Sequence, residues 1–127
     1  GTAVWVEGFT PPSSEYTTNV ANGNTNLTLL STNYPATITP SEIDVAIIAL
    51  TNGAPTLNTQ IVVQVSANNG TNYQEVTLTD SGMYDATKRF YTGSVTDITN
   101  PGNKLSYKIL TTNAVDVSFY GASIMYK

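Results

Sequence analysis

Alternation of apolar and polar residues is the feature that most limits the folds open to this chain. In the segment TQIVVQVSA, Ile61, Val63 and Val65 fall on one face of an extended strand, whereas Gln64 and Ser66 fall on the other. The segment LSYKILTT repeats the pattern. No stretch shows a sustained helical period with capping residues at its start. Because such alternation is typical of strands with one buried face, we expect antiparallel β-structure.

Eight segments carry this pattern, or a short apolar run, between clusters of Gly, Pro, Asn and Asp. We predict strands at Ala3–Phe9, Asn26–Thr32, Glu42–Leu50, Thr59–Ala67, Tyr73–Thr79, Arg89–Val95, Leu105–Thr112 and Asp116–Tyr126. In 127 residues without helices, about eight strands predict an all-β fold, an antiparallel β-sandwich that is jelly-roll-like. We expect a single domain, with an N-terminal strand and polar arm in residues 1–25 and the sandwich in residues 26–127.

The strand expected around Val45–Leu50 is apolar on both faces. A buried helix is the competing interpretation, but Pro40 on one side and Asn52-Gly53 on the other leave too little room for it. We therefore expect a central strand that is covered by sheet on one face and by a partner subunit on the other.

Polar segments rich in Asn predict the turns and one long loop. Asn69-Gly70 suits a type I′ hairpin turn, which requires positive φ at both central residues. Asn113-Ala114 is expected to join the last two strands as a hairpin. The segment TPPSSEYTTNVANGNT, residues 10–25, has little to bury and is expected to form a long loop or arm over the surface.

Cysteine and histidine are absent from the chain, which excludes disulfides, zinc–thiolate sites, thiol nucleophiles and an imidazole base. Only 11% of the residues are charged, the net charge is −4, and the five cations are scattered. A nucleic-acid binder needs a cationic stripe, and a membrane span needs a longer apolar run than this chain has. We expect no nucleic acid, no membrane and no cofactor as partners. Thr and Asn, at 21 and 13 residues, provide a neutral polar surface instead.

Paired carboxylates are the one catalytic chemistry left to consider. Glu42 and Asp44 fall on one face of a strand, but nothing marks the cleft between two facing acids that a glycosidase requires. Asp80 and Asp85 could offer oxygens to calcium, yet they are five residues apart with Met83 between them. A turn is the simpler interpretation of that segment. We expect a protein that is not an enzyme and has no metal site.

Aromatic side chains could bind sugars, because they combine a flat apolar face with polar edges. In a sandwich, half of the aromatic residues of any strand belong to the core. The residues expected in loops are therefore the better candidates for glycan contacts, and these are Tyr34 and Tyr84.

The second half of the chain resembles a β-sandwich domain that recurs in virion proteins of tailed bacteriophages. The resemblance lies in VSANNGTNYQEVTLTD, then KRFYTGSV, then KLSYKILTTNAVDVSFYGASIMY. These motifs are specific as a set and weak singly, and they cover the chain from Gln64 onward. The resemblance implies a virion structural protein, either a capsid decoration (cement) protein or a tail-fibre domain, and it implies no catalytic residues.

A decoration protein of this kind would bind the major capsid protein or another virion protein, and the resemblance implies a homotrimer. The N-terminal arm would tether it to the shell or to a neighbouring subunit. Apolar residues of the central and last strands are the expected subunit or capsid contacts: Val45, Ile47, Ile48, Phe119, Ile124, Met125 and Tyr126. The alternative that the sequence leaves open is a carbohydrate- or receptor-binding tail-fibre domain.

Overall fold

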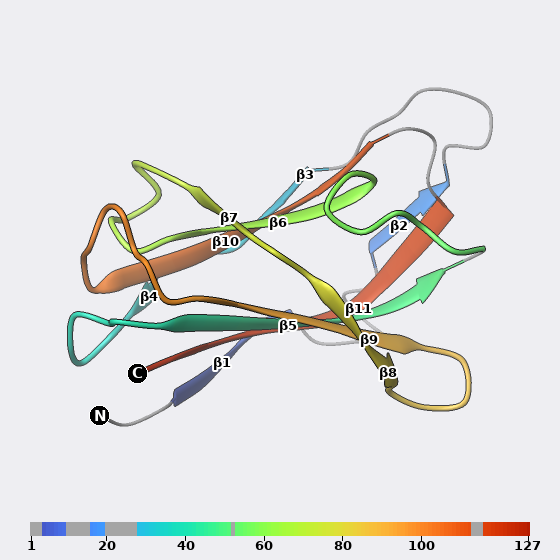
Figure 1. Cartoon of the computed structure of the whole chain (residues 1–127), viewed down its shortest axis with the longest axis horizontal. Helices are drawn as coiled ribbons and strands as arrows, with labels where there is room; N and C mark the ends of the chain where they lie inside the picture. Colours follow the sequence, from blue (N-terminus) through green and yellow to red (C-terminus); the bar gives the residue numbers. More distant parts are fainter. Residues whose placement is uncertain (1–3, 10–15, 20–27, 52, 113–115) are drawn as a thin grey trace.

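The computed structural model describes residues 4–9, 16–19, 28–51, 53–112 and 116–127. Within these ranges the chain forms strands and no helix, arranged as two sheets packed face to face (Figure 1). All pairings between the strands are antiparallel. The prediction of an all-β antiparallel sandwich is therefore confirmed.

The six-stranded sheet has the order β1-β11-β5-β9-β8, and β2 also pairs with β11. Its strands are β1 (Val4–Phe9), β2 (Tyr16–Asn19), β5 (Ile43–Thr51), β8 (Thr79–Met83), β9 (Arg89–Val95) and β11 (Asp116–Tyr126). The five-stranded sheet has the order β3-β10-β6-β7, and β4 also pairs with β10. Its strands are β3 (Thr28–Leu30), β4 (Tyr34–Pro35), β6 (Ile61–Ser66), β7 (Gln74–Val76) and β10 (Lys104–Thr111).

Eight of these strands are connected as a jelly roll. The pairs are nested along the chain: β1 lies beside β11, β3 beside β10, β5 beside β9, and β6 beside β7. This nesting rolls one long double-stranded ribbon into two four-stranded layers, the arrangement of a jelly roll. Strands β2, β4 and β8 are short additions. The predicted hairpin at Asn113-Ala114 is wrong, because β10 and β11 belong to different sheets; residues 113–115 themselves lie outside the described ranges.

The eight predicted strands are present, and β9 and β11 have the predicted bounds. The segment Tyr73–Thr79 differs, since it divides into β7 in one sheet and the start of β8 in the other. The chain passes between the sheets at Thr77–Leu78, which is the yellow crossing in Figure 1. Within the expected polar arm, Tyr16–Asn19 forms β2, which pairs with β11. The rest of residues 10–25 lies outside the described ranges.

The core lies between the two sheets. It receives alternate residues of the long strands, and its largest fully buried side chain is Phe119 of β11, at 0% exposure. In β5 the core residues are Ile43, Val45, Ile47 and Ala49, so the even-numbered residues point to the outside. The core of this jelly roll is thus complete within one chain.

The Asn69-Gly70 turn forms as predicted. Both residues have positive φ, 63° and 75°, and the turn joins β6 to β7. The buried Ser66 hydroxyl accepts hydrogen bonds from the backbone N–H groups of Gly70 (3.0 Å) and Asn68 (3.3 Å) and donates to Asn68 Oδ1 (3.0 Å). A side chain of β6, the strand that precedes the turn, therefore stabilises the turn.

Asn58 holds the crossing between the sheets. Its side-chain amide donates to the carbonyl oxygen of Leu78 (3.0 Å), and its Oδ1 accepts from the backbone N–H of Leu78 (2.8 Å). Asn58 has a φ of 66°, which Asn tolerates better than most residues. The amide thus provides Leu78, 3% exposed, with the hydrogen bonds that a neighbouring strand would otherwise supply.

We expect Asn58→Ala to lower the free energy of unfolding by about 1–2 kcal/mol, because two hydrogen bonds to a buried backbone segment are lost. Urea denaturation followed by tryptophan fluorescence measures the loss. Asn100→Ala is the matched control, since the Asn100 amide bonds only to the exposed Thr99 hydroxyl among the described residues. Equal stability of the two variants would contradict the role given to Asn58.

Candidate functional site

The outer face of the six-stranded sheet is the candidate functional site. We use the name "outer face" for the side chains of this sheet that point away from the five-stranded sheet. In the central part of the sheet they come from β5, β9 and β11, and no described strand covers them (Figure 1). The members that carry the argument below are Asp44, Ile48, Lys88, Phe90, Tyr120 and Met125.

An apolar and aromatic cluster occupies one end of the outer face. Ile48 of β5 pairs in register with Phe90 of β9, and both are half-buried. The rings of Phe90 and Tyr84 lie with their centroids 6.1 Å apart. On the other side of β5, the ammonium group of Lys88 lies 4.6 Å from the centroid of the Tyr120 ring. This end therefore combines partly exposed apolar and aromatic side chains with one cation.

A shallow groove of about 430 Å³ extends from Phe90 of this cluster to Asp44 at the other end. Thr92, Ser94 and Met125 contribute to its walls, together with Asp44. The Oδ1 atom of Asp44 is inaccessible to solvent, and it has no hydrogen-bond partner within the described part of the chain. A buried carboxylate oxygen of this kind is costly unless a donor reaches it.

The structure divides the seven predicted contact residues into two groups. Five of them are core residues of a single chain, with at most 3% exposure: Val45, Ile47, Phe119, Ile124 and Tyr126. The prediction that these five residues are subunit or capsid contacts is wrong, because their side chains already pack between the two sheets. Ile48 and Met125 are half-buried members of the outer face, where a neighbour can reach them.

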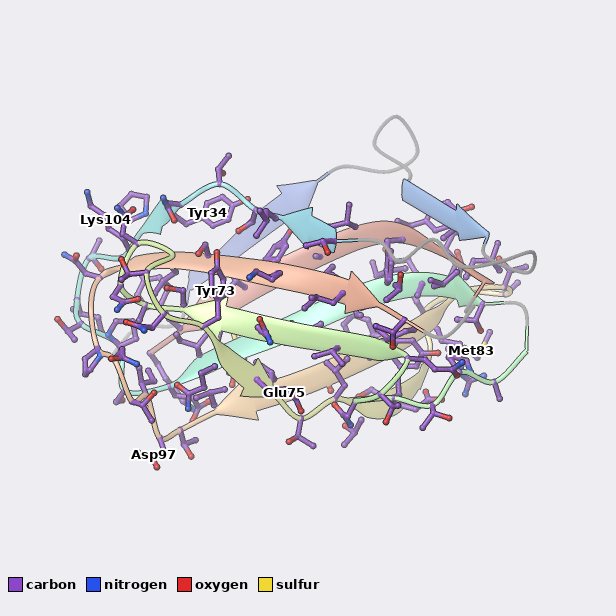
Figure 2. The ribbon with its side chains drawn as sticks, turned by 90° about the horizontal axis from the view of Figure 1, so that it is seen from above. Tyr34, Tyr73, Glu75, Met83, Asp97 and Lys104 are labelled. Carbon is purple, nitrogen blue, oxygen red and sulfur yellow. The ribbon has the colours of Figure 1, made fainter. Side chains whose placement is uncertain are left out.

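The two predicted glycan contacts lie far apart. Tyr34 belongs to β4 and packs against the edge of the core, whereas Tyr84 is 58% exposed beyond the end of β8. Figure 2 places Tyr34 and Met83, the residue before Tyr84, at opposite ends of the molecule. The structure therefore does not bring this pair together into one site.

Three carboxylates form ion pairs in the described ranges. Glu42 forms an ion pair with Lys127 (3.4 Å), and Asp80 forms one with Arg89 (2.8 Å). The groove contains one acid, Asp44, and a second cavity of about 400 Å³ beside Tyr91 also contains one, Asp80. Neither cavity offers two facing carboxylates. In the described ranges no three acids gather where a metal ion could bind, and no helix there could cross a membrane.

Asp85 shapes the loop that carries Lys88. The backbone N–H groups of Thr87 (2.9 Å) and Lys88 (2.8 Å) donate to Asp85 Oδ1, and these bonds, with the Lys88 ammonium at 3.1 Å, lower the pKa of Asp85 from 3.8 to about 2. A carboxyl group whose pKa is lowered on folding stabilises the fold above its unfolded pKa. That contribution is lost as the pH falls from 3.8 toward 2.

We expect Asp85→Asn to weaken the fall in melting temperature between about pH 4 and about pH 2, because the variant has no proton to gain there. Circular dichroism melts across this range measure the effect. The control is Asp97→Asn, which removes a charge from another exposed loop. An unchanged pH profile in Asp85→Asn would contradict the hydrogen bonds assigned to Asp85.

Phe90, Tyr120 and Lys88 are members of the outer face that the sequence analysis did not identify. Alternation along the strand Arg89–Val95 turns Phe90 outward, once its neighbour Tyr91, 2% exposed, is known to point inward. The place of Tyr120 on the outer face results from an irregularity in the strand between Phe119 and Gly121, and only the pairing with β5 reveals this irregularity. The ammonium of Lys88 contacts the ring of Tyr120, which is distant in sequence. No local pattern in the sequence therefore predicts its position.

Comparisons with known proteins assign this chain to no family. No protein family matches the sequence, and no curated protein sequence matches it significantly. The crystal structure of FLHE aligns with a TM-score of 0.43 and 10% identity over 99% of this chain and 96% of that chain. Chains of infectious bursal disease virus, strains Gx and Gt, align with TM-scores of 0.46 and 0.47 and identities of 14% and 15%. These alignments cover 98% and 97% of this chain but 33% and 31% of the viral chains, so this chain spans about a third of their length.

Proposed function

We propose that this chain is a non-enzymatic structural protein of a bacteriophage virion, and that it is a capsid decoration (cement) protein that binds and stabilises the head shell. The observation that carries the proposal is the uncovered apolar face of the six-stranded sheet. Ile48, Phe90 and Met125 are apolar side chains that remain partly exposed there. Surfaces of this kind mark sites of association between proteins.

The motifs that resemble tailed-phage virion proteins support the proposal by their positions. They form the segment from the end of β6 to the start of β8, and the strands β9, β10 and β11, and so contribute to both sheets. The motif KRFYTGSV also provides Lys88 and Phe90 of the outer face, and the last motif provides Tyr120 and Met125. The segments of the resemblance therefore build the sandwich and much of its uncovered face.

The partners that follow are the major capsid protein or another virion protein, at the outer surface of the particle, and the expected oligomer is a homotrimer. Low charge suits this role, because a protein with few charges and many Thr and Asn side chains has little electrostatic attraction to unrelated surfaces. Among the described residues neither cavity contains a second carboxylate facing the first, which favours a structural role over carboxylate catalysis.

Heads produced without this chain provide the test. We expect the purified protein to sediment with them and to raise the temperature at which they release DNA. Ile48→Asp, which places a charge on the outer face, is expected to weaken both effects. Leu30→Asp is the control, since Leu30 is exposed at 64% on the five-stranded sheet. Heads that neither bind the protein nor gain stability would overturn the proposal.

A second candidate is a carbohydrate- or receptor-binding tail-fibre domain, and the observation that favours it is the exposed ring of Tyr84 beside Phe90. Aromatic rings in this position can stack on sugars. A glycan array distinguishes the candidates. Binding that is lost in Tyr84→Ala and kept in Tyr34→Ala would favour the tail-fibre domain, whereas an array without binding would count against it.

A further inference from the structure

Two charges of opposite sign lie on the outer face, near its two ends. Asp44 lies at one end, opposite Ser94 of β9 and Met125 of β11, and its Oδ1 atom is buried without a hydrogen-bond partner in the described ranges. Lys88 lies at the other end, just before Arg89, which pairs with Ala49. The face between them is formed by apolar and small side chains.

The two charges are placed symmetrically about the middle of β5. Arg89 is opposite Ala49, so Lys88 is level with Leu50, six residues along the strand from Asp44 and about 20 Å away. The Lys88 side chain starts just before β9, but its ammonium lies over the ring of Tyr120 of β11. Because β5 lies between β9 and β11, this side chain reaches across β5. The ammonium of Lys88 is therefore at most one strand away from β5, the strand that carries Asp44.

We propose that the outer face binds a second copy of this chain about a two-fold axis. The axis lies between the facing six-stranded sheets of the two copies and crosses β5 near Ile47. The rotation places Asp44 opposite the partner's Lys88, and this pair occurs twice in the dimer. Ile48, Phe90 and Met125 of each copy pack against the same patch of the other copy, as in an isologous interface. The inference rests on the proposed function only in treating the outer face as an assembly surface.

Charge complementarity selects the second copy as the occupant. Asp44 is half-buried and has no ion pair among the described residues, and the partner's ammonium group supplies the opposite charge. The existing bond of Lys88 to Asp85 is an exposed ion pair, with side-chain exposures of 21% and 42%, so it competes weakly. The pairing thus gives Asp44 an opposite charge at the cost of one exposed ion pair.

The size of the face predicts a weak dimer. Four strands spaced by about 4.8 Å and a length of about 20 Å give about 400 Å² per copy, half the area per partner of a standard stable interface. Pairing is therefore expected at protein concentrations of hundreds of micromolar and at low salt. On a virion surface, where copies are held close together, a weak contact of this kind is sufficient.

Sedimentation equilibrium of the full chain tests the pairing. We expect Asp44→Lys and Lys88→Glu each to weaken self-association at least tenfold, because each variant places like charges opposite one another. An equimolar mixture of the two variants restores both opposite-charge pairs, so we expect it to associate within threefold of the wild type. The controls are Glu75→Lys and Lys108→Glu, which make the same charge changes on β7 and β10 of the other sheet.

The outcomes separate this inference from the proposed function. A wild-type monomer or trimer that neither variant alters would overturn the pairing, and so would a mixture that fails to associate. A dimer that depends on both charges supports it, as does a hexamer that either substitution divides into trimers. Binding to heads is scored in its own assay. A charge-dependent dimer that does not bind heads would overturn the proposed virion role, but the proposed pairing would still hold.

Discussion

Replacing Phe119 with alanine is expected to lower the free energy of unfolding by about 3–5 kcal/mol, the largest effect that we predict for a single substitution. Phe119 is fully buried between the sheets, so the change removes a whole ring and leaves a cavity that the surrounding strands cannot close. Domains of this size are stable by about 5–15 kcal/mol in total. The variant is therefore expected to be close to unfolding at room temperature.

Urea denaturation of Phe119→Ala and Phe90→Ala measures the prediction with a matched control. The two substitutions delete the same atoms, but Phe90 is on the outer face and half-exposed. We expect Phe90→Ala to cost about 1–2 kcal/mol, because less apolar surface returns to water. Equal losses in the two variants would contradict the assignment of Phe119 to the inside and of Phe90 to the outside.

The second large effect is expected at Gly93, where β9 passes beneath the crossing between the sheets. A Cβ atom at this position would overlap the carbonyl oxygen of Thr77 and would lie 2.6 Å from Cγ1 of Val76. The backbone of Thr77 cannot move without disturbing its neighbour Leu78, which Asn58 holds by two hydrogen bonds. We therefore expect Gly93→Ala to cost about 3 kcal/mol, at the upper end of the usual range for overpacking.

Thermal and urea melts of Gly93→Ala provide the measurement, and Ser94→Ala is the control. Ser94 is the next residue and is exposed, so its loss is expected to change stability by less than about 0.5 kcal/mol. If Gly93→Ala were as stable as this control, the chain would not cross between the sheets against Gly93.

Much of the strand content could be predicted from local patterns. The alternation around Tyr107, and the turn residues on either side of Arg89–Val95, act within a few neighbouring residues, and both strands formed as expected. The break at Thr77–Leu78 could not be predicted, because it depends on Asn58 and Gly93, which are distant in sequence. Which strands share a sheet is likewise a property of the whole roll.

The candidate site could be predicted only in part, because hydrophobicity does not tell which face of a strand points inward. In β5 both faces are apolar, so Val45 and Ile48 looked equivalent, yet Val45 is in the core and Ile48 is on the outer face. In β11 an irregularity between Phe119 and Gly121 shifts the alternation. A strict period of two would place Phe119 and Met125 on one face, but the shift buries Ile124 and turns Met125 outward.

A reconstruction by electron cryomicroscopy of the intact phage particle tests the central claim most directly. The account predicts density for the jelly roll on the outer surface of the head, with the outer face of its six-stranded sheet buried against protein rather than facing solvent. The result that would contradict it is a particle whose head carries no such density, with this chain either absent or confined to the tip of a tail fibre.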